Sequence, residues 1–426
     1  MQHAPASFAP SPAHRLWRLL PPVRRRRALT YVTARLAPGP DRTPPPASRG
    51  LAVGGELSRA SGLGEGARLM LRGAARLGLP TWPVDLGAPG INRTAEIPPL
   101  TADPPQAPPP GVPLVLHINA PLIPLAMLRL GHNLRCGRQI IGYWAWELPV
   151  VPPDWYAGLK FVHQLWAPSS FTAAALAPLF PGAVRVVRPP LAVLPPTPLR
   201  LDRAAFGLPS NAVVILVAFN LASSFVRKNP LAAIAAFRAA FGTRADRFLL
   251  LKVGDPTHFP DDFATLRAAI AGAPNIRIET RVLPPDDRTA LMNTADIVLT
   301  LHRSEGLGLV AAEAMLLGKP VIATGWSGNL DFMDDVSAAL VPARLIPPRD
   351  PRGVLQVAGT VWADPDIGVA TAHLRRLADD PTARTTLGAR GRRMAQARFG
   401  LDTLADALRD IGLPVGDLPM GGLPPP

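Results

Sequence analysis

Short apolar runs alternate with amphipathic stretches along the second half of the chain. The run 213–219 is rich in β-branched residues, and Asn229 and Pro230 then supply a cap and a first-turn proline for a helix. Short apolar strands that alternate with helices are typical of a parallel sheet covered on both faces, so we predict an α/β fold. The predicted strands are 213–219, 247–253, 275–279, 296–301 and 321–323, and predicted helices begin near residues 230, 287 and 308.

The first half shows the same alternation with more interruptions. From residue 51 to about 192 the pattern predicts strand, glycine loop, helix and strand. Eight prolines within 97–113 predict an extended surface excursion, and the proline-punctuated stretch 188–198 predicts a linker. The predicted organisation is a tail at 1–50, an N-terminal domain at 51–192, a C-terminal domain at 193–398, and a final helix with a tail at 399–426.

Composition excludes several classes of protein. Of the 426 residues, 48% are hydrophobic and 18% are charged, so the chain can bury a core and is not disordered as a whole. Its single cysteine, Cys136, excludes an intrachain disulfide and a cysteine-based metal cluster. No apolar run approaches the roughly 20 residues of a membrane-spanning helix, and the N-terminus lacks the apolar stretch of a secretory signal. We therefore expect a cytoplasmic protein.

The net charge of +14 is concentrated in the tail. Residues 1–50 hold nine Arg, one Asp and ten Pro, which predicts a poorly ordered arm. Apolar residues within 16–20 lie beside the arginine run 24–27, so a short basic amphipathic piece could rest on anionic lipid headgroups at the inner face of a membrane. The alternatives are a solvated tail and a contact with nucleic acid.

The strongest chemical signal is the segment 304–324, S-E-G-L-G-L-V-A-A-E-A-M-L-L-G-K-P-V-I-A-T. Glu305 precedes a predicted helix and Glu313 lies within it, while Gly306 and Gly308 let a ligand approach the backbone. The start of the helix directs unpaired N–H groups toward the same place, which suits a phosphate or a sugar oxygen. Because the neighbours of Glu313 are almost all apolar, its carboxylate needs a partner such as a vicinal diol. The alternative is a solvated helix residue.

This segment, with the Gly328 and Asn329 loop that follows, resembles the donor-site signature of the retaining glycosyltransferases of family four. The resemblance covers roughly residues 51–412 and implies the GT-B fold, in which two Rossmann-like domains with parallel sheets face each other. It implies that Glu313 holds the ribose hydroxyls of a nucleotide-sugar and that Glu305, assigned to catalysis, contacts the transferred sugar. The backbone amides implied in donor binding belong to Gly306, Leu307, Gly308 and Leu309.

The reaction implied by the resemblance is the transfer of a hexose from a nucleotide-sugar, such as GDP-mannose or UDP-glucose, to a glycan or a lipid-linked acceptor. The departing diphosphate is dianionic, and without a metal its charge must be met by fixed cations and helix dipoles. No spacing of His, Glu and Asp resembles a metal site, so we expect no metal and no other cofactor. The alternatives are a non-catalytic GT-B scaffold, against which the two glutamates count, and a basic nucleic-acid-binding protein, against which the position of the charge counts.

The loop 220–230, N-L-A-S-S-F-V-R-K-N-P, is the candidate source of those cations because it follows a predicted strand. Family members often carry an Arg and a Lys five residues apart here. This chain instead has Ser223 five residues before Lys228, with Arg227 adjacent to the lysine. We expect Lys228 to act in catalysis, and Arg227 and Ser223 to lie at the donor. Since the chain has only four lysines, Lys252 at the end of a predicted strand is also assigned to the donor.

The glycine loop 54–66 follows the first predicted strand of the N-terminal half. A glycine-rich loop alone is a weak signal, since it occurs wherever a strand turns tightly into a helix. In the resembled family a loop at this place closes against the donor and shapes the acceptor site. The resemblance therefore assigns Gly62 and Gly64 to acceptor binding.

The loop 141–154 places one carboxylate, Glu147, between Trp144 and Trp146 on one side and Pro149 on the other. Many family-four enzymes have a His at a comparable place, and this chain has none. Aromatic faces stack on sugar C–H surfaces and a carboxylate can orient hydroxyls, so we assign the two rings to the acceptor and Glu147 to catalysis. Core packing around one satisfied glutamate is the alternative.

Two histidines follow predicted strands. His117 comes directly after the strand 114–116, where it can contact an acceptor sugar or serve as a structural hydrogen-bonding residue. His302 lies just before Glu305, with the same two possibilities. We include His117 among the acceptor-binding candidates.

Overall fold

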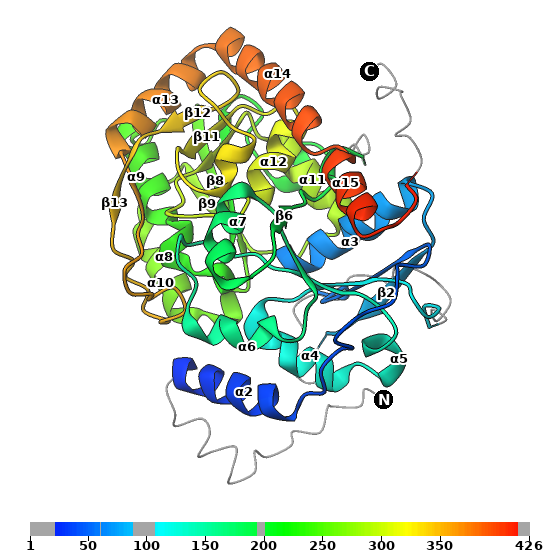
Figure 1. Cartoon of the computed structure of the whole chain (residues 1–426). Helices are drawn as coiled ribbons and strands as arrows, with labels where there is room; N and C mark the ends of the chain where they lie inside the picture. The colour runs from blue at the N-terminus through cyan, green and yellow to red at the C-terminus, as the bar shows by residue number, and fades with distance from the viewer. Residues whose placement is uncertain (1–21, 60, 88–106, 194–200, 416–426) are drawn as a thin grey trace, which may run out of the picture.

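The computed structural model describes residues 22–59, 61–87, 107–193 and 201–415. They form two parallel sheets of six strands each, with helices packed on both (Figure 1). The first sheet has the order β2-β1-β3-β4-β5-β6. Its strands are β1 (Leu51–Gly55), β2 (Thr81–Asp85), β3 (Leu114–His117), β4 (Ile140–Tyr143), β5 (Gln164–Ala167) and β6 (Val184–Val186).

The second sheet has the order β12-β11-β10-β7-β8-β9. Its strands are β7 (Val213–Asn220), β8 (Arg247–Gly254), β9 (Ile276–Glu279), β10 (Ile297–Thr300), β11 (Val321–Thr324) and β12 (Ala339–Val341). β7 and β8 pair in parallel over their full lengths, and their apolar residues are buried in two clusters on opposite faces of the sheet. This burial on both faces explains why these strands read as continuous apolar runs, and the α/β prediction is confirmed.

Helices surround the two sheets. In the first half they are α2 (Pro22–Leu36), α3 (Gly62–Arg76), α4 (Ile123–Arg129), α5 (His132–Arg135), α6 (Tyr156–Leu159) and α7 (Ser170–Leu176). In the second half they are α8 (Phe225–Lys228), α9 (Pro230–Phe241), α10 (Pro260–Ala269), α11 (Pro285–Thr294), α12 (Leu309–Leu316), α13 (Ile367–Asp379), α14 (Pro381–Arg398) and α15 (Asp402–Asp410).

The last helix returns to the first sheet. Leu404 and Leu408 of α15 are buried in the same cluster as Met70 of α3 and Val53 of β1. Figure 1 shows α15 lying beside α3 at the end of the long helix α14. The two sheets fall on either side of the predicted boundary at residues 192 and 193, and the boundary itself stays a prediction.

The predicted tail differs from the structure. Residues 22–36 form the helix α2, so the expectation of a poorly ordered arm is wrong there, and residues 1–21 lie outside the described part. The helix is possible because its only proline, Pro22, stands at the first position, where no N–H donor is required. The predicted proline-rich excursion also falls largely on residues outside the described part, at 88–106.

A second difference lies between β12 and α13. Residues 343–365 form an antiparallel hairpin, β13 (Ala343–Ile346) with β14 (Trp362–Pro365), that the pattern did not predict. Leu355 and Trp362 of this segment are buried in the core of the first half, together with Trp155. The segment therefore connects the second sheet to the core beside the first.

Candidate active site

Loops that follow β4, β7 and β10 meet between the two sheets. Lys228 Nζ lies 2.5 Å from Glu305 Oε1, and Arg227 Nη1 lies 3.0 Å from Glu305 Oε2. A second carboxylate, Glu147 Oε1, lies 3.6 Å from Arg227 Nη2. The structure thus brings together the three predicted catalytic residues and one predicted donor residue. We call these four side chains the Glu305 cluster.

Unusual backbone conformations place the two cations. Ser224 has φ 73°, and its hydroxyl accepts a hydrogen bond from the Arg227 N–H, which caps the short helix α8. Asn229 has φ 52° and ends that helix, while its amide donates to the Leu301 carbonyl at 2.9 Å. Pro230 then starts α9. Lys228 is therefore held at a fixed junction between two helices, next to the end of β10.

Arg227 is held more completely than Lys228. Its guanidinium donates to the Ser223 carbonyl at 2.8 Å and to the Ser304 carbonyl at 2.7 Å, in addition to Glu305. Its side chain is 4% exposed, against 17% for Lys228. Ser223 contributes its carbonyl here and is exposed as a residue, so the predicted contact of Ser223 with the donor stays a prediction.

The pKa directions follow from burial and pairing. Burial alone would raise the pKa of Glu305, but the charges of Lys228 and Arg227 outweigh it and hold the pKa well below its usual range. Burial would lower the pKa of Arg227, and the charges of Glu305 and Glu147 raise it overall. Burial lowers the pKa of Lys228 in spite of Glu305. At neutral pH the Glu305 carboxylate is ionised.

The aromatic rings beside Glu147 are buried. Trp144 is 0% and Trp146 is 4% exposed, and both pack edge-on against Trp155, with ring centroids 5.8 and 5.0 Å apart. Trp146 also donates its indole N–H to the Val150 carbonyl at 2.9 Å. This burial contradicts the expectation that either ring stacks on an acceptor, because neither face is open to a ligand. The rings instead support the loop that carries Glu147.

Gly306 is hydrogen-bonded to residues of the first half of the chain. Its carbonyl accepts hydrogen bonds from Ser169 Oγ at 2.5 Å and Thr172 Oγ1 at 3.3 Å, near the start of α7. A Cβ at this glycine would lie 3.1 Å from the Trp146 carbonyl. Leu307 is 6% exposed and packs in the core of the second half. The Gly306 carbonyl and the Leu307 side chain thus make contacts within the protein. Donor binding by the amides of these two residues stays a prediction.

The starts of α3 and α12 lie next to each other. Gly308 has φ +98°, which favours glycine, and α12 begins at Leu309. A Cβ at Gly62, in the first turn of α3, would lie 3.9 Å from Leu309 Cδ1. A Cβ at Gly64 would lie 2.4 Å from the Glu56 carbonyl, so packing within its own loop requires this glycine. Two helix starts thus lie side by side: the Gly64 N–H of α3 is capped by the Ser61 hydroxyl at 3.0 Å, whereas no side chain caps the first turn of α12.

Glu313 differs from Glu305 in its surroundings. Its Oε1 lies 4.0 Å from Arg288 Nη2, and none of the residues that the structure describes donates a hydrogen bond to its carboxylate. Burial raises its pKa, the charge of Arg288 opposes the rise, and the charge of Glu65 adds to it. The side chain is 26% exposed, so a ligand can reach it.

Further charged residues continue from Glu313 along the ends of β8 and β9. Burial lowers the pKa of Lys252, which the charge of Glu279 opposes. Glu279 in turn accepts hydrogen bonds from Arg281, at 2.6 Å for the Nη2 group. The predicted donor residue Lys252 thus lies close to Arg288, which sequence reasoning missed because a single arginine within a helix has no distinguishing pattern.

Both histidine candidates are buried. His117 is 1% exposed and stacks on Tyr143, with ring centroids 4.1 Å apart. Burial lowers its pKa to about 3. The predicted role of His117 in acceptor binding is therefore contradicted, because the ring lies in the core. His302 is also 1% exposed and interacts with Asn329 Oδ1 at 3.1 Å, which positions the loop before Glu305.

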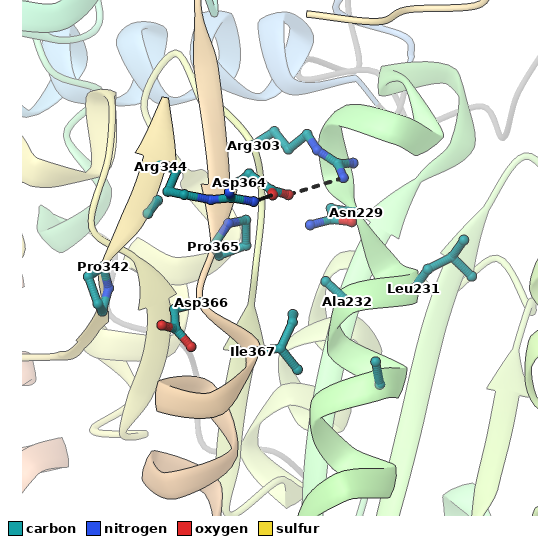
Figure 2. Close-up of a pocket in the computed structure, with 12 residues that line it drawn as sticks. Asn229, Leu231, Ala232, Arg303, Pro342, Arg344, Asp364, Pro365, Asp366 and Ile367 are labelled. Atoms are coloured by element: carbon teal, nitrogen blue, oxygen red, sulfur yellow. Dashed lines mark hydrogen bonds and ion pairs between the residues drawn. The ribbon is translucent and has the colours of Figure 1, made fainter. Parts of the chain in front are cut away.

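A separate cavity of about 720 Å³ lies between the start of α9 and the hairpin β13–β14 (Figure 2). Figure 2 shows Arg303 and Arg344 reaching toward Asp364, at 3.6 and 3.2 Å. Neither glutamate of the 304–324 segment lines this cavity. Among the residues that the structure describes, no group of three or more His, Cys, Asp or Glu could hold a metal ion.

Part of the chain matches a known family of proteins. Residues 213–364 match the family described as glycosyl transferases group 1. The D-inositol 3-phosphate glycosyltransferase of Kineococcus radiotolerans is 31% identical over 54% of this chain and 52% of its own length. The protein of the same name from Saccharomonospora viridis is 32% identical over 54% of this chain and 50% of its own length. The chain thus spans about half the length of the curated relatives it matches.

Solved structures support the fold. HepE of Anabaena, in complex with UDP and glucose, matches with a TM-score of 0.58 and 14% identity over 85% of this chain and 99% of that protein. The sucrose-phosphate synthase of Thermosynechococcus elongatus matches with a TM-score of 0.59 and 18% identity over 85% of this chain and 98% of that protein. Residues 213–364 therefore match a glycosyl transferases group 1 domain, and the chain has the GT-B fold of these solved structures.

Proposed function

We propose that this protein is a retaining glycosyltransferase that moves a hexose from a nucleotide-sugar to a glycan or a lipid-linked acceptor. The observation that carries the proposal is the pair of glutamates around the start of α12. Glu305 holds Lys228 beside that helix start, whereas Glu313 has a reachable carboxylate to which no described residue donates a hydrogen bond. Both lie inside the matched group 1 domain.

The diphosphate of the donor is proposed to bind near Lys228 and the start of α12. Lys228 is the more exposed of the two cations, and among the described residues its ammonium contacts Glu305 alone, so it can also contact a phosphate. Unpaired N–H groups at the helix start add favourable charge for an anion. These groups would stabilise the departing diphosphate, and we propose that no metal ion is needed.

Arg227 is proposed to position this site rather than to bind the donor itself. Its guanidinium already contacts the carbonyls of Ser223 and Ser304 and the carboxylate of Glu305. It lies between Glu147 and Glu305, which separates the two negative charges. Glu147, whose side chain is 29% exposed, can then face the transferred sugar or the acceptor.

Glu313 is proposed to accept hydrogen bonds from the ribose hydroxyls of the nucleotide. A half-buried carboxylate without a donor group is costly, and a vicinal diol supplies two donors at once. Hydrogen bonds to a charged group contribute roughly 1.5–3 kcal/mol. The co-substrates consistent with this site are nucleotide-sugars such as UDP-glucose and GDP-mannose. Contacts between the two halves around Gly306 would exclude water, which competes with the acceptor for the activated sugar.

The direct test is product analysis with a panel of labelled nucleotide-sugars, with and without a metal chelator. Mass spectrometry should show transfer from one of them, turnover should persist in chelator, and NMR of the product should show the anomeric configuration of the donor. Glu313→Gln should lose nucleotide binding, and Asp406→Asn on the exposed face of α15 is a matched control.

Three outcomes would contradict the proposal. Nucleotide binding without any turnover across the panel would favour a scaffold. An inverted product would exclude retention, and loss of turnover in chelator that is restored by a metal would exclude metal independence. Unchanged nucleotide affinity in Glu313→Gln would remove the assignment of the ribose contact.

A further inference from the structure

The outer side of α2 carries an unusual combination of side chains. We propose that α2 and the elements beneath it dock this protein on an anionic membrane surface. The occupant we commit to is a bilayer that contains anionic lipid headgroups. Figure 1 shows α2 at the edge of the molecule, below α4 and α6. The proposal does not depend on the catalytic assignment.

One side of α2 is fixed to the protein. Thr30 and Ala34 are buried, at 3% and 8% exposed, and the Thr30 hydroxyl donates to the Pro121 carbonyl at 3.1 Å. Lys160 Nζ donates to the Ala34 carbonyl at 2.6 Å. Arg26 pairs with Asp154 at 3.0 Å. The helix is thus a folded part of the surface, and its orientation is set by these contacts.

The opposite side of α2 exposes apolar residues in a row. Leu29, Val32 and Leu36 are 37%, 50% and 68% exposed, and their spacing of three and four residues aligns them on a helix. Tyr31 is 56% exposed on the adjoining side. Such a row has no partner among the described residues, although exposure of large apolar side chains to water is unfavourable.

Neighbouring elements extend this apolar surface. Fourteen large hydrophobic residues are exposed in the described part of the chain, and eight of them lie on α2 or on the elements and loop next to it. The four beyond α2 are Leu122, Leu128, Val150 and Tyr156. These residues belong to or adjoin the short helix η1 (Ala120–Leu122), α4, η2 (Pro153–Trp155) and α6, all of which contact α2. The exposed apolar residues therefore concentrate on one face of the molecule.

The charge of this face complements an anionic surface. Helix α2 contains five Arg and no Asp or Glu. Arg24, Arg27 and Arg35 are exposed and form no ion pair with any residue that the structure describes. Arg35 lies over the Tyr31 ring of the same helix. A helix with an apolar row beside unpaired arginines is the composition that binds in the headgroup region of a bilayer.

A bilayer explains both parts of the surface. Nucleic acid would use the arginines but would leave the row of leucine and valine in water. In the described part of the chain no helix is long and apolar enough to cross a membrane, so the inferred contact lies on the surface. Each arginine near an anionic surface raises the affinity for the membrane about fivefold. The apolar row contributes a hydrophobic part of the affinity that salt does not screen.

The test is co-flotation of the full chain with vesicles of phosphatidylcholine alone or mixed with phosphatidylglycerol. Binding is expected to the mixed vesicles and to weaken at high salt. Arg24→Gln/Arg27→Gln/Arg35→Gln should lower the affinity by about a hundredfold. Val32→Asp/Leu36→Asp should lower it by more than about tenfold. These positions are exposed, so the fold should persist, which circular dichroism checks.

Matched controls lie on the second half of the chain. Val282→Asp/Leu345→Asp changes two exposed apolar residues, and Arg390→Gln/Arg392→Gln/Arg393→Gln removes three exposed arginines of α14. Both controls should bind vesicles as the unchanged protein does. Equal loss of binding in the controls would show that net charge or general hydrophobicity is responsible and would overturn the proposal.

Two other occupants of the face would also overturn it. If Val32→Asp/Leu36→Asp converts a dimer to a monomer in sedimentation and leaves vesicle binding unchanged, the face binds a second copy. If Trp17→Ala/Leu20→Ala abolishes vesicle binding and Val32→Asp/Leu36→Asp does not, the contact belongs to residues 1–21. Absence of binding to mixed vesicles at low salt would exclude membrane docking altogether.

Discussion

Glu305 and Glu313 lie eight residues apart at the two sides of one helix start, yet their surroundings are opposite. Glu305 has Lys228 at 2.5 Å and Arg227 at 3.0 Å, and these cations hold its pKa well below the usual range. Glu313 has Arg288 only at 4.0 Å, and burial raises its pKa. The protein itself satisfies the first carboxylate, whereas no described residue donates a hydrogen bond to the second.

This difference separates two roles within one motif. A paired buried carboxylate stabilises the folded state, since its removal would leave buried cations without a partner. A carboxylate without a full set of partners lowers the stability of the folded state, and a ligand that binds to it restores that stability. The comparison therefore predicts that equivalent substitutions at the two positions change stability in opposite directions.

The largest expected effect is that of Glu305→Ala. Arg227 and Lys228 would lose their shared partner while the former stays buried, which lowers the free energy of unfolding by about 3–5 kcal/mol. Chemical denaturation followed by circular dichroism measures this change. Asp406→Ala, in an exposed pair on α15, should change it little. A loss at Glu305 no greater than at Asp406 would show that the cluster does not contribute to stability.

The second prediction concerns Glu313→Gln. Nucleotide affinity should fall by about tenfold to a hundredfold, because a charged acceptor is replaced by a neutral one. The free energy of unfolding at neutral pH should rise slightly, because a buried charge is removed. Calorimetric titration and denaturation measure the two quantities. A variant that loses stability as Glu305→Ala does would erase the distinction between the two glutamates.

Acid should also distinguish them. The folded pKa of Glu305 is lowered, so its contribution to stability is present above about pH 4.3, the ordinary value, and is lost as pH falls through the folded pKa. The loss is at most about 1.4 kcal/mol per pH unit for one group. Glu313 has a raised pKa, so its contribution is full below about pH 4.3 and is lost as pH rises through the folded pKa.

Unfolding curves at several pH values test this difference. In Glu305→Gln, the free energy of unfolding should fall less on acidification than in the unchanged protein. In Glu313→Gln, it should fall less as the pH rises above about 4.3. Parallel pH profiles for the two variants would contradict the assigned pKa directions.

The smallest effect is expected from Arg288→Gln. Its charge opposes the rise in the pKa of Glu313, so its removal should raise that pKa further. As the pH falls, Glu313 takes up its proton at a higher pH in this variant, so nucleotide affinity should begin to decline at a higher pH than in the unchanged protein. Well above that pH the affinity should change little. Calorimetric titration across pH provides the measurement. An equal loss of affinity at every pH would mean that Arg288 contacts the nucleotide itself.

The sequence pattern predicted several of the elements and residues that form the site. The strand β7 and the helix α9 were predictable because the apolar period and the proline at the first helical position agreed at residues 213–241. The side chain of Asn229, expected to cap α9, instead donates to the Leu301 carbonyl. The placement of Glu305 and Lys228 after neighbouring strands indicated that they lie close together, and the structure brings them into contact, while their roles and that of Glu313 at a sugar nucleotide stay predictions. Trp144, Trp146 and His117 were assigned wrongly, since the same aromatic residues serve a core or a ligand surface. Only their neighbours in space decide between the two.

By itself, the amino-acid sequence determined the alternation of strands and helices, the acidic pair at residues 305 and 313, and the excess of arginine near the N-terminus. These depend on interactions between residues close in the chain or on composition. Tertiary structure alone decided that Glu305 is paired with cations while Glu313 is nearly free of partners, that two tryptophans are buried, and that α2 turns an apolar row outward. Each of these depends on residues brought together from distant segments, and burial and charge pairing are properties of that arrangement.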